Sequence, residues 1–118
     1  MNFLKLREGK AGYEVLHKYA GWRAAFITYS PRFDSREKNL LERHLLTDEI
    51  FILLKGKADL YIGEKACRQA MKKGEMYVIK AGEWHSVALS KRAKVAVFEN
   101  IETGKENSEY KTFQGEDK

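Results

Sequence analysis

Short runs of β-branched and aromatic residues recur along this chain, and turn-forming residues separate each run from the next. The runs are AAFITYS (24–30), EIFILLK (49–55), ADLYIG (58–63), EMYVIK (75–80), HSVALS (85–90) and AKVAVFENI (93–101). Closely spaced runs of this kind are typical of the strands of a β-sandwich or β-barrel. Pro31 directly follows the first run and helps to end it. The sequence therefore predicts an all-β fold.

The length of the chain suits a single domain. With 118 residues, it is long enough to bury a core and too short for two domains. A hydrophobic fraction of 43% beside 33% charged residues is typical of globular proteins. We expect a β-barrel domain over residues 1–101. A polar C-terminal tail over residues 102–118 is expected to be ordered in part at most, with Tyr110 and Phe113 as candidate anchors.

Composition also narrows the partners and the compartment. The net charge is +5, but basic and acidic residues are interleaved, and no nucleic-acid-binding motif is recognisable. No apolar run approaches the ~20 residues of a membrane span. The N-terminal residues lack a signal-peptide pattern, and the single Cys67 excludes an internal disulfide. These features predict a cytoplasmic protein that binds neither nucleic acid nor membrane.

The stretch LLERHLLTDEIFILLKG (40–56) admits two interpretations. Its leucines recur at helical spacing, and its residue types favour a helix. However, IFILL is a continuous bulky run, bounded by Thr47-Asp48 on one side and Gly56 on the other, and the run after Gly56 alternates as a strand does. We therefore predict two strands joined by a turn at Thr47-Asp48.

On that interpretation, the stretch gathers metal-binding side chains. Glu42 and His44 are two residues apart, so they share one face of a strand. A turn between paired strands brings Glu49 back beside His44, and His85 opens another strand downstream. Two imidazoles and a carboxylate are the ligands of many divalent-metal sites, and Glu42 adds a fourth candidate. A histidine buried for structural reasons is the alternative for His44.

These residues resemble the two motifs of the cupin superfamily. The first motif reads G-x5-H-x-H-x3-4-E-x6-G, and its second half is matched by His44, Glu49 and Gly56. The second motif reads G-x5-P-x-G-x2-H-x3-N, and its first part is matched by Gly74, Gly82 and His85. Both occur in order and at the family's spacing within residues 36–89. The resemblance implies the jelly-roll β-barrel, or double-stranded β-helix, of a small single-domain cupin.

The chain departs from the motifs at four positions, which are Arg36, Glu42, Lys80 and Leu89 in place of the family's glycine, first histidine, proline and asparagine. By resemblance, the metal ligands would be Glu42, His44, Glu49 and His85. Two carboxylates tilt the preference towards manganese or iron(II), while nickel and zinc also fit. Glu42 is a ligand, a general base beside the metal, or the partner of a nearby Arg or Lys.

The cupin fold hosts many activities, so the resemblance leaves the function open. One hypothesis is a divalent-metal-dependent enzyme that acts on a small, polar, oxygen-rich substrate by oxygenation or isomerisation, with Glu42 as the candidate catalytic residue. The alternative is a non-catalytic module that binds or senses a small molecule or a metal. The resemblance also implies a homodimer, and a lone barrel has edge strands to cover.

Overall fold

The computed structural model describes residues 1, 3, 11–37 and 40–113. Within these residues, ten strands and three short 3-10 helices follow one another, and α-helix is absent. The strands are β1 (Tyr13–Tyr19), β2 (Trp22–Thr28), β3 (Leu40–His44), β4 (Glu49–Lys55), β5 (Ala58–Ile62), β6 (Cys67–Ala70), β7 (Met76–Ile79), β8 (His85–Leu89), β9 (Lys94–Asn100) and β10 (Ser108–Thr112). The 3-10 helices are η1 (Pro31–Phe33), η2 (Ser35–Glu37) and η3 (Lys105–Asn107). The all-β fold class predicted from the sequence is confirmed.

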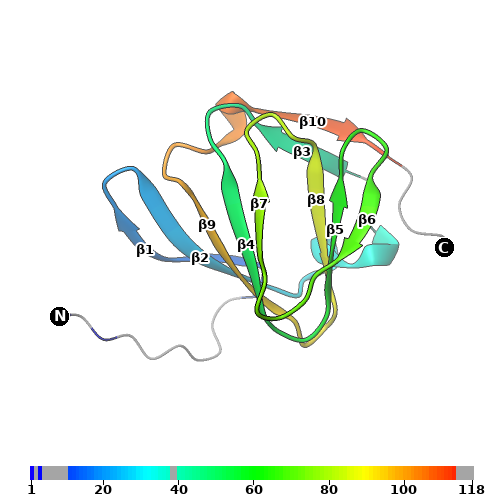
Figure 1. Ribbon diagram of the computed structural model, residues 1–118, viewed down its shortest axis with the longest axis horizontal. Helices are drawn as coiled ribbons and strands as arrows, with labels where there is room; N and C mark the ends of the chain where they lie inside the picture. Colours follow the sequence, from blue (N-terminus) through cyan, green and yellow to red (C-terminus); the bar gives the residue numbers. More distant parts are fainter. Residues whose placement is uncertain (2, 4–10, 38–39, 114–118) are drawn as a thin grey trace.

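The strands form two five-stranded sheets (Figure 1). The first sheet has the order β1-β2-β9-β4-β7, and the second has the order β10-β3-β8-β5-β6. Neighbouring strands within each sheet pair in the antiparallel direction. Because β3 belongs to the second sheet and β4 to the first, the turn between them passes from one sheet to the other. This crossing brings the side chains at the end of β3 towards those at the start of β4.

The stretch 40–56 forms β3 and β4 with a turn between them, so the strand–turn–strand prediction is confirmed and the helix is excluded. Along β4, Glu49, Phe51 and Leu53 are buried at 5%, 3% and 4% exposure, whereas the residues between them are only partly buried. This period of two is that of a strand with one face in the core. Tertiary packing therefore outweighs the helical propensity of the leucines.

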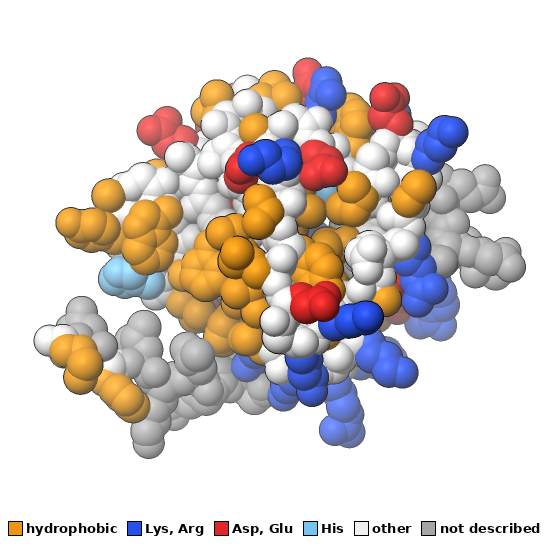
Figure 2. Space-filling model, in the orientation of Figure 1, with side chains coloured by type: hydrophobic (Ala, Val, Ile, Leu, Met, Phe, Trp, Pro, Cys, Tyr) orange, Lys and Arg blue, Asp and Glu red, His pale blue; other side chains and the backbone are white. Residues whose placement is uncertain are grey.

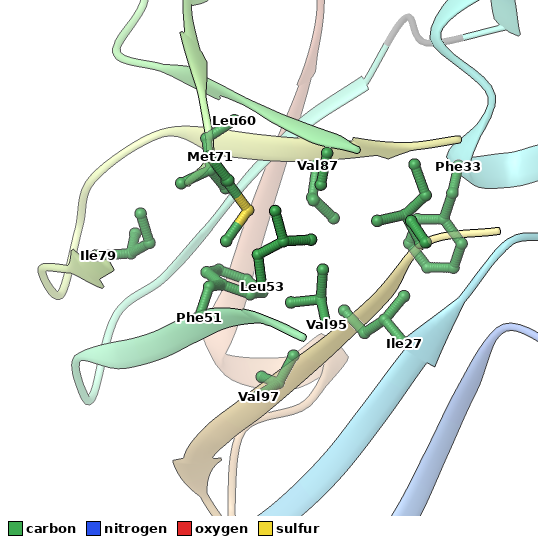
Figure 3. Packing of buried hydrophobic residues seen from close by; sticks show 13 residues of the cluster. Ile27, Phe33, Phe51, Leu53, Leu60, Met71, Ile79, Val87, Val95 and Val97 are labelled. Carbon is green, nitrogen blue, oxygen red and sulfur yellow. The ribbon is translucent and has the colours of Figure 1, made fainter. Parts of the chain in front are cut away.

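The hydrophobic core lies between the two sheets (Figure 3). The first sheet contributes Phe51, Leu53, Val95 and Val97, among others, and the second contributes Leu60 and Val87. Glu49 precedes Phe51 by two residues, and Glu99 follows Val97 by two, so each acid continues a buried apolar row. A polar cluster therefore lies directly beside the apolar core.

The second sheet is covered on its outer side by residues of its own chain. Leu41, Tyr61 and Ala88 form a small buried cluster there, and Trp84 and Phe113 pack against it. Strand β10 lies within the segment for which the sequence predicted a partly ordered polar tail. It pairs with β3 from Ser108 opposite His44 to Thr112 opposite Leu40.

Gly56 allows the turn after β4 to pack against the turn before β9. Its φ is +76°, and a Cβ built on it would lie 2.5 Å from the Cα of Ala93. Real Cβ atoms do not approach backbone so closely, and side-chain-bearing residues rarely adopt this φ. The glycine predicted from the first motif is therefore required by both space and backbone conformation.

Candidate metal centre

The four residues that the sequence singled out come together at one end of the interior. Glu42 and His44 lie on β3, Glu49 begins β4, and His85 begins β8. His44 Nε2 lies 3.1 Å from Glu42 Oε1 and 3.5 Å from Glu49 Oε1. His85 Nε2 lies 3.1 Å from the same Glu49 oxygen. All four side chains thus converge, while their role as ligands stays a prediction.

Turns at the edge of the cluster fix the strands that carry it. Asp48 accepts hydrogen bonds from the backbone N–H of Ala81, at 2.8 Å, and from Lys80 Nζ, at 2.9 Å. The backbone N–H of Gly82 donates to the carbonyl of His44 at 2.8 Å. The β3–β4 turn and the β7–β8 turn are therefore tied together. Lys80, which stands at the family's proline position, takes part in this connection.

Each histidine is oriented by a hydrogen bond at its far nitrogen. Ser108 Oγ donates its one proton to the carbonyl of Gly104 at 2.7 Å, so it accepts from Nδ1–H of His44 at 2.8 Å. Nδ1–H of His85 donates to the carbonyl of Glu83 at 3.0 Å. With the Nδ1 atoms protonated, the neutral rings present the Nε2 lone pairs to the cluster, as metal-ligating histidines do.

Glu49 has a buried oxygen that lacks a hydrogen-bond partner in the described part of the chain. This Oε1 atom faces the Nε2 lone pairs of His44 and His85. Acceptors that converge at such distances repel each other unless a proton or a metal cation lies between them. The donor set and its buried, unsatisfied oxygen thus fit a divalent ion.

The protonation of the cluster follows from burial and from neighbouring charges. Burial, together with the adjacent Glu99 carboxylate, raises the pKa of Glu49 to about 9. Burial also lowers the pKa of His85 and so favours its neutral form. For His44, burial acts in the same direction, but the contact with Glu42 and the charge of Glu49 outweigh it and raise the pKa.

Glu99 on β9 is a buried member of the cluster that sequence reasoning missed. It lies opposite Glu49 in the β4–β9 register and opposite Arg23 in the β2–β9 register. Its Oε2 accepts hydrogen bonds from Tyr13 Oη and from Arg23 Nε at 2.9 Å. Burial raises the pKa of Glu99, but hydrogen bonds from Glu49, Tyr13 and Arg23 outweigh it, and the net shift is downward.

Ligand atoms of the cluster fall into two overlapping groups, each within 4.8 Å. One group is Glu42, His44 and His85, and the other is His44, Glu49 and Glu99. Three carboxyl groups lie beside two imidazoles there, and the guanidinium groups of Arg23 and Arg32 lie close enough to lower the pKa values of Glu99 and Glu42. The cluster therefore has the composition of a site that can hold a metal ion, without naming which one.

A cavity of about 470 Å³ adjoins the cluster. Besides the acids and histidines, its lining includes Arg23, Arg32, Lys105 and Tyr110. His17 lies elsewhere, with its ring centroid 6.0 Å from that of Trp22, and it lines neither the cavity nor the cluster. The cavity has the size of a small-molecule pocket.

Comparisons with known proteins agree with this architecture. A family model described as "Cupin domain" matches residues 32–99, which is more than half of the chain. Among curated proteins, no sequence matches the chain. Within the described residues, no helix is long and apolar enough to cross a membrane.

Solved structures show the same fold at low sequence identity. A cupin-2 domain protein from Shewanella frigidimarina has a TM-score of 0.61 at 19% identity, covering 79% of this chain and 84% of its own. A Klebsiella pneumoniae protein with a double-stranded β-helix domain has a TM-score of 0.61 at 14% identity, with 91% and 84% covered. Fe(II)-HppE, solved with an alternative substrate, has a TM-score of 0.57 at 14% identity, with 73% and 47% covered. The predicted double-stranded β-helix is confirmed, and the chain belongs to the cupin family.

Proposed function

We propose that the chain binds one divalent ion through Glu42, His44, Glu49 and His85. The observation that carries this proposal is the buried Oε1 of Glu49, which faces the Nε2 atoms of both histidines without a hydrogen-bond donor in the described chain. A bound dication would satisfy all of these acceptors at once and offset the excess of carboxylates. Iron(II), manganese, nickel and zinc are all compatible with two nitrogens and two carboxylates.

The proposed activity is metal-dependent catalysis on a small, oxygen-rich substrate. A divalent ion held there would supply a Lewis acid that polarises substrate oxygens. The cavity of about 470 Å³ gives space for such a molecule, and Arg32 and Lys105 in its lining favour an anionic one. Fe(II)-HppE is a structural neighbour whose name includes iron(II), and iron(II) is one of the ions proposed here. The proposed reaction classes are oxygenation and isomerisation.

Within this proposal, Glu42 is the group that exchanges a proton with the substrate. Both Glu42 and Glu49 line the cavity, but the Glu42 side chain is the more exposed of the two, at 29% against 7%. Burial raises the pKa of Glu42, but the contact with His44 and the charge of His85 outweigh this effect and lower it. Glu42 is therefore ionised at neutral pH and accepts rather than donates a proton.

A non-catalytic binding module is the second candidate, and Glu99 favours it. With Glu99, the cluster offers five ligand side chains. A site that takes all its ligands from the protein leaves no open position for a substrate, as structural metal sites do. The two candidates therefore differ in whether the bound ion still accepts an external ligand.

Metal analysis tests the binding proposal. Protein purified without chelators or added metal should contain about one divalent ion per chain, as measured by inductively coupled plasma mass spectrometry. The double variant His44→Ala/His85→Ala should lose it, whereas the control His17→Ala should keep it. A double variant that keeps stoichiometric metal would show that the site lies elsewhere.

An external chelating acid separates enzyme from binder. We expect oxalate, added to the cobalt(II)-substituted protein, to change the visible absorption spectrum because it occupies open positions. A spectrum that oxalate leaves unchanged would favour the closed, non-catalytic site. A mixture of cobalt(II), oxalate and the double histidine variant, which should not bind the ion, provides the baseline.

A further inference from the structure

Basic side chains gather at the end of the barrel opposite the candidate metal centre. They lie in or beside two turns, one between β4 and β5 and the other between β8 and β9. Because Glu49 begins β4 and His85 begins β8, the far ends of these strands lie away from the metal centre (Figure 1). Figure 2 shows Lys and Arg side chains along the lower edge of the molecule, where the two turns lie in Figure 1. We call five residues the basic end: Lys55, Lys57, Lys91, Arg92 and Lys94.

Close packing of the two turns holds these cations together. A Cβ on Gly56 would lie 2.5 Å from the Cα of Ala93, so the backbones of the turns are in contact. The backbone N–H of Ser90 donates to the carbonyl of Lys57 at 2.9 Å, and Ser90 Oγ accepts from the N–H of Lys57 at 3.1 Å. The charges of the two turns therefore cannot move apart unless these contacts break.

The positive charge of the basic end is uncompensated in the described part of the chain. Lys55 and Lys94 stand opposite each other in the β4–β9 register, where like charges destabilise a sheet. Among the described residues, none forms an ion pair with a side chain of the basic end. The chain has 22 Lys and Arg against 17 Asp and Glu, so these five cations equal its whole excess of positive charge. An anion from outside the chain would relieve a repulsion that the fold imposes.

A pocket of about 470 Å³ lies within the basic end. All of the five cations except Lys57 line it. Lys94 Nζ lies 4.9 Å from the centroid of the Phe26 ring, and Lys91 Nζ lies 6.0 Å from that of the Tyr29 ring. Such contacts position an ammonium group, but they leave its charge without a counter-ion. The pocket therefore combines the size of a small-molecule site with cations that are already in place.

We propose that the basic end binds a small molecule that carries two or three linked phosphate groups. One phosphate group carries a charge of about −1.5 to −2 near pH 7, so two groups offset the four cations that line the pocket. Lysine ammonium groups bind phosphate oxygens as point charges, and the guanidinium of Arg92 has the geometry to bind two oxygens at once. The site is separate from the metal centre and does not rest on the function proposed for that centre.

The shape of the basic end favours a small ligand over a macromolecule. Nucleic acids bind along extended positive surfaces, and single strands also stack on exposed aromatic side chains. Here the cations surround one pocket, and the neighbouring ring of Phe26 is buried. Stable attachment to a membrane takes an apolar element besides basic residues. Apart from the buried Ala93, the two turns consist of glycine, serine and cations.

Isothermal titration with inorganic pyrophosphate tests the site. The full-length chain should bind about one pyrophosphate, with an affinity that falls as sodium chloride is added. Lys55→Gln/Lys94→Gln should weaken binding by at least about 10-fold, because it removes two charged contacts. The matched control is Lys18→Gln/Lys65→Gln, which makes the same change in net charge. Lys18 and Lys65 are exposed and line neither this pocket nor the cavity beside the metal centre, so the control should bind as the wild type does.

The outcomes distinguish this site from the other places where an anion could bind. Pyrophosphate is itself a chelator, and binding at the metal centre would be equally strong in the wild type and in both double variants, which would overturn the proposal. The proposal is also wrong if the wild type does not bind pyrophosphate below about 1 mM, or if sulfate at equal ionic strength binds as tightly. Circular dichroism of each variant verifies that it is folded.

Further titrations identify the source of the phosphate groups. If ADP binds more tightly than pyrophosphate, and the Lys55→Gln/Lys94→Gln variant weakens both, the ligand is a nucleotide. Equal affinities in the wild type would show that the phosphate groups alone are recognised, which also supports the proposal. Single-stranded DNA or phosphatidylserine vesicles that bind through the same two lysines, while pyrophosphate does not bind, would overturn it in favour of a macromolecular partner.

Discussion

Glu49 of β4 and Glu99 of β9 oppose each other directly in an antiparallel register, and both carboxyl groups are buried. Because two charges of the same sign would repel at such positions, burial beside Glu99 raises the pKa of Glu49 to about 9. Arg23 stands next in the same row, opposite Glu99 on β2. In this inward row of the first sheet, the cation Arg23 is therefore followed by the acids Glu99 and Glu49. Both acids belong to the candidate metal centre.

Arg23→Met should destabilise the metal-free protein. The Arg23 side chain is 19% exposed and Glu99 is 5% exposed, so the change leaves a buried acid without its counter-ion. Such losses cost about 3–5 kcal/mol. Thermal and urea unfolding measure the effect, and added manganese should restore part of the stability because a dication replaces the lost charge.

The surface pair Arg68–Asp59 provides the control for this experiment. Its side chains are 56% and 24% exposed, so Arg68→Met should cost no more than about 1 kcal/mol. If the Arg23 variant were no less stable than the Arg68 variant, the charge balance described for the row would be wrong.

Ser108→Ala should weaken metal binding without removing a ligand. Ser108 accepts the Nδ1–H bond that fixes the ring of His44, and loss of such partners typically costs about 10–100-fold in metal affinity. Isothermal titration with zinc measures the change. Ser90→Ala is the control, because Ser90 Oγ accepts a hydrogen bond only from the Lys57 backbone in the described structure. Equal affinities for both variants would remove Ser108 from the site.

Substitutions of Glu42 should reveal whether it binds the ion. Glu42→Gln removes a charge at nearly constant size, and we expect it to weaken manganese binding by at least about 10-fold. Loss of a residue that only hydrogen-bonds to a metal ligand already costs about that much. Glu42→His should shift the preference from manganese towards zinc, nickel or copper. Titrations of both variants with manganese and zinc measure this. Unchanged constants in both would leave a set of three ligands.

Two glycines with similar backbone conformations allow the cost of a steric clash to be distinguished from the cost of a positive φ. Gly56 and Gly63 have φ values of +76° and +82°, but only a Cβ on Gly56 would meet the backbone of Ala93. Gly63→Ala should therefore cost roughly 1–2 kcal/mol from backbone conformation alone. Gly56→Ala should cost clearly more in urea unfolding. Equal losses would mean that the turn relaxes away from Ala93.

Runs of β-branched and aromatic residues between turns made much of the fold predictable. The runs around β4, β5, β8 and β9 coincide with strands, and most of their inward positions are apolar. Strand β6 was not predicted because all four of its residues are exposed. Strand β1 was not predicted because its residues are mostly polar or exposed. Edge strands such as these carry little hydrophobic pattern.

The site was predictable where one strand or turn places its residues. His44 and Glu49 flank a single turn, and motif spacing added His85. The position of Glu99 is visible in the sequence, because Glu99 continues the alternate positions of Val95 and Val97 along the same strand. Arg23 and Tyr13 could not be assigned to the site from the sequence, because their approach to Glu99 depends on pairing between strands far apart in the chain. The homodimer and the ligand roles remain predictions.

Strand β3 meets β8 through one residue pair in the described part of the chain, Glu42 opposite His85. Strand β10 is joined to β3 along its whole length, so the β3–β10 ribbon is attached to the rest of its sheet by a narrow seam. An ion bound by Glu42 and His85 would link β3 to β8. It would take the place of the backbone hydrogen bonds that a longer strand pairing would provide. Amide hydrogens of the ribbon should then exchange faster in metal-free protein and slow on loading, while those of β5 stay unchanged. Metal occupancy would in this way set the mechanical integrity of one wall of the barrel.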